Sequence, residues 1–262
     1  MTKARVSACV MTFNNEDIIQ DCMENVKWAN EVIVVDSYST DKTVDICRKY
    51  TNRVYQRKWP GFQDQSNYIA GLAKYEWILF TDADEIISPE LYEEIQSHLN
   101  NNSNSWDGFY FPRRTRYLGK WINHGEWYPA YDLLLYKKDK GKWVKEPHAT
   151  LDLNGRAKYL KNDCLHYTYR NLSHQLERID KYTSMSAVEM NKKDVKFLTL
   201  QLISRPIIRF IKGYFFKRGF LDGIPGLVSA TTTSFYVFMK YAKLFELRLK
   251  NQPQIDTDKH ER

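Results

Sequence analysis

The sequence predicts an α/β fold with a mostly parallel sheet covered by helices. Strand and helix patterns alternate through roughly the first 100 residues, which is typical of this class. Residues 77–80 (WILF) are too continuously apolar for a strand with one wet face, so we expect a central strand buried on both sides. A chain of 262 residues with 43% hydrophobic residues can form one large domain, or a domain of about 200 residues with an appendage.

The expected elements follow one another in order. We predict strands at residues 6–12, 31–36, 53–56 and 77–80. We predict helices at residues 16–26 and 63–74, and a further helix from Pro89 onward. One more helix follows the second strand, and Ser37, Ser39 or Thr40 can cap it. Asn14 or Asn15 is the expected cap of the first helix, and Leu91, Ile95 and Leu99 form the buried stripe of the fourth. Such sheets bind ligands at the carboxyl ends of their strands.

Polar residues stand at three of these strand ends: Thr12 to Asn14, Asp36 with Ser37, and Asp82-Ala83-Asp84. On an extended segment residues i and i+2 point the same way, so Asp82 and Asp84 can hold one divalent cation, with Ala83 leaving room. A helix cap with a solvated turn is the alternative. Asp36 can bind a ribose hydroxyl or a base N–H, or it can cap the next helix.

The segment after the first strand reads TFNNED, without the glycines that hold a pyrophosphate in dinucleotide-binding domains. A diphosphate bound here therefore needs a cation to neutralise it, and Asp82 with Asp84 can supply the site.

Composition narrows the class of protein further. The net charge of +7 suits an anionic partner. Four scattered cysteines without a Cys-x-x-Cys pair suggest neither a zinc site nor a disulfide scaffold. The apolar run at the N-terminus is too short for a signal peptide, so we expect a cytoplasmic protein.

Three segments in the first half of the chain form one recognisable set: VSACVMTFNNED, EVIVVDSYSTDKTVDI and WILFTDADEIISPE. Together they resemble family 2 inverting glycosyltransferases of the GT-A (Rossmann-like) fold. Two later segments, GFYFPRRTRYLGKWINHGEWYP and GFLDGIPGLVSATTTSFYVFMKYAKL, resemble the branch of that family that includes bacterial lipopolysaccharide-core β-1,4-glucosyltransferases. The resemblance spans most of residues 4–248. It implies a UDP-sugar donor and a Mn²⁺ or Mg²⁺ ion, and no nucleic-acid partner.

The resemblance also implies roles for single residues. Thr12, Asn14 and Asp36 would hold the uridine, Asp84 the metal, and Asp82 the ribose or the metal; Glu16, Ser37 and Ala83 belong to the same expected nucleotide site. Gln65 and Asn67 match a Gly-Phe-Gly-x-Gln-Lys-Asn pattern in which Ser66 replaces the lysine, so a basic donor contact is missing or comes from elsewhere. Alternatively, both are polar residues of a helix's exposed first turn.

The general base is expected in the acceptor half of the chain. Relatives carry Asp directly after WYP; Ala130 stands there, and Asp132, two residues along a strand, keeps the same face. Glu126 ranks second, and Glu146, before Pro147-His148-Ala149, ranks third. His148 and His166 are candidate metal ligands or structural histidines. The arginines and aromatic residues between 109 and 131 suggest either a glycan groove or an aromatic core with a basic rim.

We expect a nucleotide-sugar half at residues 1–105, an acceptor half at 106–190 and a helical extension at 191–262. Residues 192–218 of the extension are rich in basic and aromatic residues, and Pro206 suits the start of a helix. This pattern predicts a helix that lies at the surface of an anionic membrane. The uncharged run at 223–239 is short for a membrane span. The alternative is packing on the catalytic domain or on a second subunit, as in a homo-oligomer.

The sequence and the resemblance thus predict a metal-dependent inverting transferase that moves a hexose, expected to be glucose, from a UDP-sugar to a lipid-anchored bacterial glycan such as lipopolysaccharide core. It would act peripherally on the cytoplasmic face of the inner membrane. The alternatives are a nucleotidyl- or phosphoryl-transfer enzyme and a non-catalytic glycan- or lipid-binding module.

Overall fold

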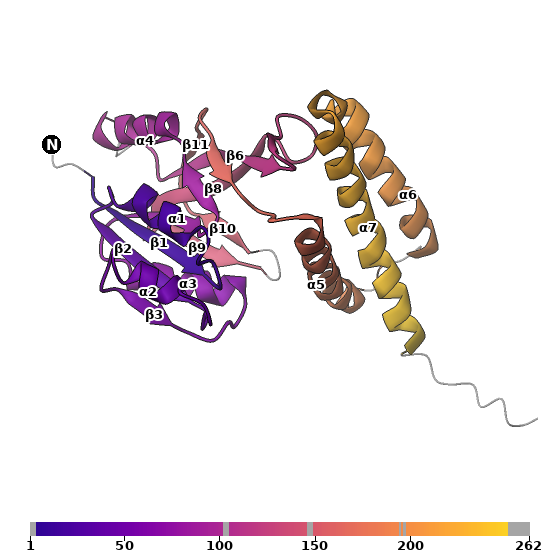
Figure 1. Ribbon diagram of the computed structural model, residues 1–262, viewed down its shortest axis with the longest axis horizontal. Coiled ribbons are helices and arrows are strands. Elements are labelled where there is room, and N and C mark those ends of the chain that lie inside the picture. Colours follow the sequence, from indigo (N-terminus) through magenta and orange to yellow (C-terminus); the bar gives the residue numbers. More distant parts are fainter. Residues whose placement is uncertain (1–3, 102–104, 146–148, 194, 196–197, 251–262) are drawn as a thin grey trace, which may run out of the picture. The chain divides into compact units, whose positions relative to one another are not determined.

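The computed structural model describes residues 4–101, 105–145, 149–193, 195 and 198–250. Within them the chain forms two compact units, one of residues 1–123 and 127–168 and one of residues 124–126 and 169–262 (Figure 1). The second unit thus begins earlier in the chain than the extension expected at residue 191, because helix α5 (Leu172–Lys192) packs on helix α7 (Ile224–Lys250).

The first unit is an α/β sheet flanked by helices, as the sequence predicts. Its elements are β1 (Val6–Thr12), α1 (Ile19–Val26), β2 (Glu31–Asp36), α2 (Thr43–Cys47), β3 (Val54–Gln56), α3 (Phe62–Leu72), β4 (Trp77–Asp82), β5 (Glu85–Ile87), α4 (Pro89–Asn101), β6 (Gly108–Tyr117), β7 (Lys120–Trp121), β8 (Ala130–Lys137), β9 (Gly141–Val144), β10 (Thr150–Leu153), β11 (Ala157–Tyr159) and β12 (Cys164–His166).

The main sheet is mixed. Its strands run in the order β3-β2-β1-β4-β8-β6-β12-β5. The first four are parallel, whereas β8 is antiparallel to both β4 and β6. The parallel register places Thr12 beside Asp36 and Met11 beside Asp82. The polar strand ends found in the sequence therefore meet at one edge of the sheet.

Strand β4 is the buried centre that its apolar run predicts. Trp77, Ile78, Leu79 and Phe80 are all buried in the core. Helix α1 buries Ile19, Cys22 and Val26, and helix α4 buries the expected stripe of Leu91, Ile95 and Leu99. Apolar side chains at helical spacing fix which face of each helix meets the sheet.

Two details of the helices differ from the expectation. Helix α1 begins at Ile19 and has no side-chain cap, because the Asn15 side chain accepts hydrogen bonds from the Phe13 N–H and the Thr12 hydroxyl instead. Pro206 lies inside helix α6 (Leu198–Ile211) rather than at its start.

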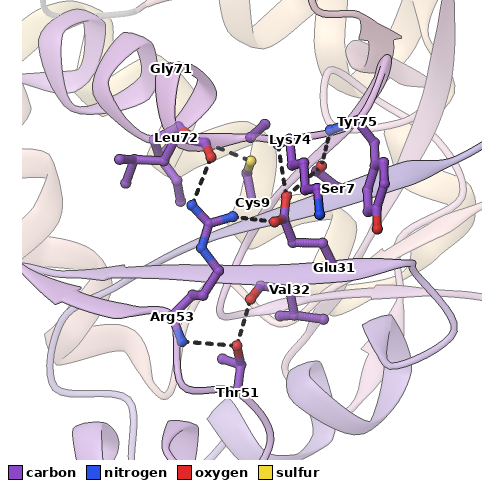
Figure 2. A network of polar contacts seen from close by, with 12 residues as sticks. Ser7, Cys9, Glu31, Val32, Thr51, Arg53, Gly71, Leu72, Lys74 and Tyr75 are labelled. Carbon is purple, nitrogen blue, oxygen red and sulfur yellow. Dashed lines mark hydrogen bonds and ion pairs between the residues drawn. The ribbon is translucent and has the colours of Figure 1, made fainter.

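A polar network joins the strands at the other edge, where β1, β2 and β4 begin (Figure 2). The Glu31 carboxylate pairs with Arg53 and accepts hydrogen bonds from the Ser7 hydroxyl (2.7 Å) and the Lys74 N–H (2.9 Å). Burial tends to raise the pKa of Glu31, but these hydrogen bonds and Arg53 outweigh it and lower the pKa. A cavity of about 370 Å³ lies beside the network. Because Glu31 and Arg53 already bind each other, we assign them a structural role.

The second unit is helical. It contains α5 (Leu172–Lys192), α6 (Leu198–Ile211), a π-helical turn η1 (Lys212–Phe216), a 3₁₀ turn η2 (Gly219–Asp222) and α7 (Ile224–Lys250). Both α5 and α6 pack along α7 (Figure 1). Among the described residues, no helix combines the length and the apolar character needed to cross a bilayer.

Candidate functional site

Asp36 ends strand β2 with its side chain completely buried. One carboxylate oxygen accepts hydrogen bonds from the Ser39 N–H (2.9 Å) and the Gln56 amide (3.1 Å), and the other accepts the Ser39 hydroxyl. Beside it, the Ser37 N–H donates to the Thr12 carbonyl (3.0 Å). Asp36 therefore orders the loop after β2, at the edge of the sheet where the polar strand ends meet.

Asn14 and Glu16 join the loop after β1 to the loop after β2. Asn14 has a positive φ of 50°; its N–H donates to the Ser39 hydroxyl (2.8 Å), and its amide oxygen accepts from the Thr40 N–H (2.8 Å). The Glu16 carboxylate accepts from the Lys42 N–H (3.0 Å). Two loops at the carboxyl ends of neighbouring strands thus form one continuous polar rim.

Gln65 and Asn67 differ in their surroundings, although both lie on helix α3. Gln65 is buried, and its amide donates to the Ser37 hydroxyl (3.4 Å) and accepts from Arg57 (3.2 Å). The Asn67 amide exchanges two hydrogen bonds with the backbone of Trp143 (2.9 and 3.0 Å). Gln65 therefore lies with the predicted nucleotide residues and brings a basic group there, whereas Asn67 fixes strand β9.

Asp82 ends strand β4, and Ala83 and Asp84 form a turn to β5, so the three residues are not one extended segment as expected. Ala83 is buried, while both aspartates are half-buried. The Glu85 carboxylate accepts from the Asp82 N–H (3.2 Å), and the Asp84 carbonyl accepts from the Tyr167 N–H (2.9 Å). The turn is fixed by its own neighbours, which holds the carboxylates at the end of the central strand.

His166 reaches the same turn from strand β12. This strand pairs with β5 so that His166 is opposite Glu85, and the His166 Nε2 lies 3.5 Å from an Asp84 carboxylate oxygen. Carboxylate oxygen is a ligand that suits Mn²⁺ and Mg²⁺, and imidazole nitrogen is a ligand of transition metals. Among the described residues, here and elsewhere, no three His, Cys, Asp or Glu side chains gather so that they could hold a metal ion. Asp84 and His166 are therefore two candidate ligands, and any further ligands would have to come from a bound molecule.

Arg113 on strand β6 links Asp84 and His166, the candidate metal ligands, to the candidate base Asp132. Its guanidinium contacts Glu85 (2.7 Å), Asp132 (2.8 Å) and His166 Nε2 (3.1 Å). Burial alone would lower the pKa of Arg113, but Glu85 and Asp132 raise it above its usual range. Burial raises the pKa of Glu85, and Arg113 opposes that shift. The sequence marked Arg113 only as one of three groove arginines; that it points toward Asp132 follows from strand register.

The three candidate bases, Asp132, Glu126 and Glu146, lie in different surroundings. The Asp132 side chain on β8 is 45% exposed and pairs with Arg113 through one oxygen. Glu126 belongs to the second unit, where its side chain is 7% exposed and pairs with Arg209 (2.8 Å) and Lys217 (3.6 Å). Glu146 and the candidate ligand His148 lie outside the described residues.

The aromatic residues of the expected groove pack largely on one another. Trp121 lies against Tyr167 and under Arg114 and Arg116, and Trp127 packs edge-on to Tyr117. Because neighbours on a strand point to opposite faces, Tyr131 does not share the face of Asp132.

A mixed sheet with acidic and polar side chains gathered at the carboxyl ends of its parallel strands defines a GT-A-like α/β enzyme. The sequence model of glycosyl transferase family 2 matches residues 7–151, more than half of the chain. The chain belongs to this family, and it is a glycosyltransferase.

Similar proteins extend over nearly the whole chain. An uncharacterized glycosyltransferase of Rickettsia typhi is 27% identical over 98% of this chain and 92% of its own length. A lipopolysaccharide core biosynthesis glycosyltransferase, LpsC of Rhizobium meliloti, is 24% identical over 97% of both chains. Among solved structures, the mannosyltransferase PcManGT of Pyrobaculum calidifontis, in complex with GDP-Man and Mn²⁺, has a TM-score of 0.57 at 16% identity, covering 93% of this chain and 88% of its own. That likeness confirms the fold.

Proposed function

We propose that this glycosyltransferase moves a hexose, namely glucose, from a UDP-sugar to a lipid-anchored bacterial glycan such as lipopolysaccharide core, with inversion at the anomeric carbon. One observation carries the proposal: Arg113 contacts both Asp132 and His166, and His166 lies against Asp84. A candidate base and a candidate metal site thus lie on two sides of one guanidinium.

The donor would bind along the carboxyl ends of β1, β2 and β4. Asp36, with Thr12, Asn14, Glu16 and Ser37 in the rim around it, is proposed to hold the uridine. Gln65 lies at the same edge and brings Arg57, which can take the place of the basic residue that Ser66 replaces. Arginine suits phosphate because its planar guanidinium offers several donors.

The diphosphate would lie at the turn after β4. Asp84 and His166 are proposed to hold a Mn²⁺ or Mg²⁺ ion, with Asp82 on the ribose or the metal beside the buried Ala83. When bound, the ion neutralises charge on the leaving diphosphate. Asn67 is a weaker donor contact, because its amide is occupied by the Trp143 backbone.

Asp132 is proposed to be the general base. Arg113 binds one of its oxygens and the side chain is half-exposed, so the other oxygen can receive a proton. In the transfer, an acceptor hydroxyl attacks the anomeric carbon and its proton passes to Asp132. The electron pair of the broken carbon–oxygen bond leaves with UDP. Glu126 is a poorer candidate because it is buried against two cations.

The acceptor assignment is supported by the relative named for lipopolysaccharide core biosynthesis, which matches over 97% of both chains. Such an acceptor is anchored in lipid, and the basic second unit suits an anionic membrane surface. We therefore place the enzyme peripherally on the cytoplasmic face of the inner membrane.

A donor hydrolysis screen tests the proposal without knowledge of the acceptor. The full-length protein is incubated with Mn²⁺ and UDP-glucose, UDP-galactose or their N-acetyl forms, and released UDP is measured. We expect UDP-glucose to be hydrolysed fastest, and the Asp84→Asn variant to lose this hydrolysis. Equal background release from all four donors would contradict the UDP-hexose assignment.

A further inference from the structure

Helix α6 (Leu198–Ile211) carries an exposed apolar face that nothing in the described part of the chain covers. Leu200, Ile203, Ile207 and Ile211 are three or four residues apart and therefore lie on one side of the helix. Each of them is exposed, Leu200 to 66%. Helices of soluble proteins normally bury such a stripe, so its exposure marks a binding surface.

The apolar face continues into the turns that follow α6. Phe215, Phe216, Phe220, Leu221 and Ile224, which we call the apolar tip, are all exposed. Phe216 reaches 80% and Ile224 reaches 74% exposure. Five large apolar side chains exposed within ten residues are far more than isolated surface residues account for.

The backbone beneath the apolar tip is tightly packed. A Cβ on Gly226 would meet the Gly219 carbonyl oxygen at 1.9 Å, and one on Gly219 would meet the Gly213 carbonyl oxygen at 2.8 Å. The Gly125 N–H donates to the Lys217 carbonyl (2.8 Å). Glycines thus allow the turns and α7 to approach closely, and the tip is presented by a packed scaffold rather than by a loose loop.

The charges on α6 and the turns that follow it have one sign, although Arg205 and Arg209 lie on the side of α6 away from the apolar stripe, where Arg205 lies over Tyr241 of α7. Between residues 198 and 227 the sequence holds five cations and one acid, Asp222. Asp222 is buried and pairs with His124 (3.0 Å). The cations are Arg205, Arg209, Lys212, Lys217 and Arg218, and all five are exposed. Glu126 offsets part of the charge of Arg209 and Lys217, and the surface remains basic.

The positive charge of this surface indicates which partner can bind to it. A second copy of the chain docked through the same face would bring like charges together, which opposes association. An anionic bilayer instead offers acyl chains to the apolar side chains and phosphates to the cations. We propose that the α6 face and the apolar tip lie in the plane of an anionic phospholipid bilayer, with Phe216 and Ile224 inserted below the headgroups. The inference rests on the proposed function, because a lipid-anchored acceptor places the enzyme at a membrane.

Cosedimentation with vesicles tests this surface. The probes are vesicles of phosphatidylglycerol with phosphatidylethanolamine, and vesicles of phosphatidylcholine alone. The wild type should bind the anionic vesicles and bind the neutral ones much more weakly. Phe216→Ser and Ile224→Ser should each weaken binding about tenfold, since each removes an inserted apolar side chain. Lys212→Gln with Arg218→Gln should weaken binding to anionic vesicles about tenfold and leave binding to neutral vesicles unchanged.

Val188→Ser is the matched control, because Val188 is also exposed, to 50%, but lies on α5 of the same unit. It should bind vesicles like the wild type. Equal binding by Phe216→Ser, Ile224→Ser and the control would overturn the proposal. So would a wild-type dimer in light scattering that dissociates in the Phe216→Ser variant, since the face would then hold a second copy.

Titration of UDP with Mn²⁺ into the same preparations separates this inference from the proposed function. The tip variants should bind UDP like the wild type, because their substitutions lie in the other unit. UDP binding without vesicle binding would remove the membrane surface and leave the donor site. Vesicle binding without UDP binding would remove the proposed donor site and leave the membrane surface.

Discussion

At the residue scale, the candidate site depends on how one arginine is surrounded. Arg113 Nη2 lies 3.1 Å from His166 Nε2, and the roles in this contact depend on the His166 tautomer. The same nitrogen lies 3.5 Å from an Asp84 carboxylate oxygen. A nitrogen whose lone pair accepts a hydrogen bond from Arg113 cannot bind a metal with it, so the proposed metal site requires His166 to release Arg113 when the ion binds.

Substitution of the candidate bases separates their roles. Asp132→Asn should lower the turnover number by roughly 100-fold or more, because the amide cannot accept the acceptor's proton, while UDP affinity stays nearly unchanged. Glu126→Gln should keep turnover within about threefold, since Glu126 pairs with cations in the second unit. Steady-state transfer rates and UDP titration give both values. The reverse order of effects would move the base to Glu126.

Arg113 is expected to position Asp132 rather than to react. Arg113→Lys keeps the charge but cannot reach three partners with one ammonium, so turnover should fall about tenfold or more. In the Asp132→Asn background the same substitution should cost little further turnover, because the group that it positions is already gone. Additive losses in this double-mutant cycle would show that Arg113 affects turnover independently of Asp132, which would contradict the positioning role.

At the element scale, periodicity located the strands well and the helix ends less well. Strands β1 and β2 have the predicted bounds because apolar runs end sharply at Thr12 and Asp36. Helix α1 starts later than expected because Asn15 serves the preceding loop. The turn after β4 was only the alternative at Asp82 to Asp84, because the hydrogen bond from the Asp82 N–H to Glu85 that helps to fix it leaves no local pattern.

A glycine pair tests the close packing of α7. Gly226→Ala should lower the free energy of unfolding by about 1–3 kcal/mol, because its Cβ would overlap the Gly219 carbonyl oxygen. Gly71→Ala on helix α3 is the control: its Cβ meets nothing within 4 Å. It should raise stability by about 0.5–1 kcal/mol, since alanine favours a helix. Urea titrations measure both, and equal stabilities for the two variants would contradict the packing.

At the scale of the whole molecule, the sequence could predict the enzyme class but not the assignment of residues 124–126. Composition marked the basic, aromatic C-terminal region. It could not show that Glu126 would join that region, because the long-range pairs with Arg209 and Lys217 leave no local pattern. Glu126, which the sequence suggested as a candidate base, therefore belongs to the helical second unit.

Ionic strength should affect the proposed membrane-binding surface more than the proposed UDP site. Raising salt from about 0.1 M to about 1 M shortens the screening length from about 10 Å to about 3 Å. Binding to phosphatidylglycerol vesicles should then fall at least about tenfold, because the cations on α6 and the apolar tip are exposed. UDP affinity in Mn²⁺ should change much less, since it depends on direct contacts. Salt-independent vesicle binding would contradict the electrostatic part of the account.

The most direct test of the central claim is calorimetric titration of UDP into the wild type and the Asp84→Asn variant, with and without Mn²⁺. The account predicts that Mn²⁺ strengthens UDP binding to the wild type by about tenfold or more, because metal and diphosphate bind as one unit. It also predicts that Asp84→Asn loses this enhancement and keeps the metal-free affinity. Equal UDP affinity with and without Mn²⁺ in the wild type, or full enhancement in Asp84→Asn, would contradict it.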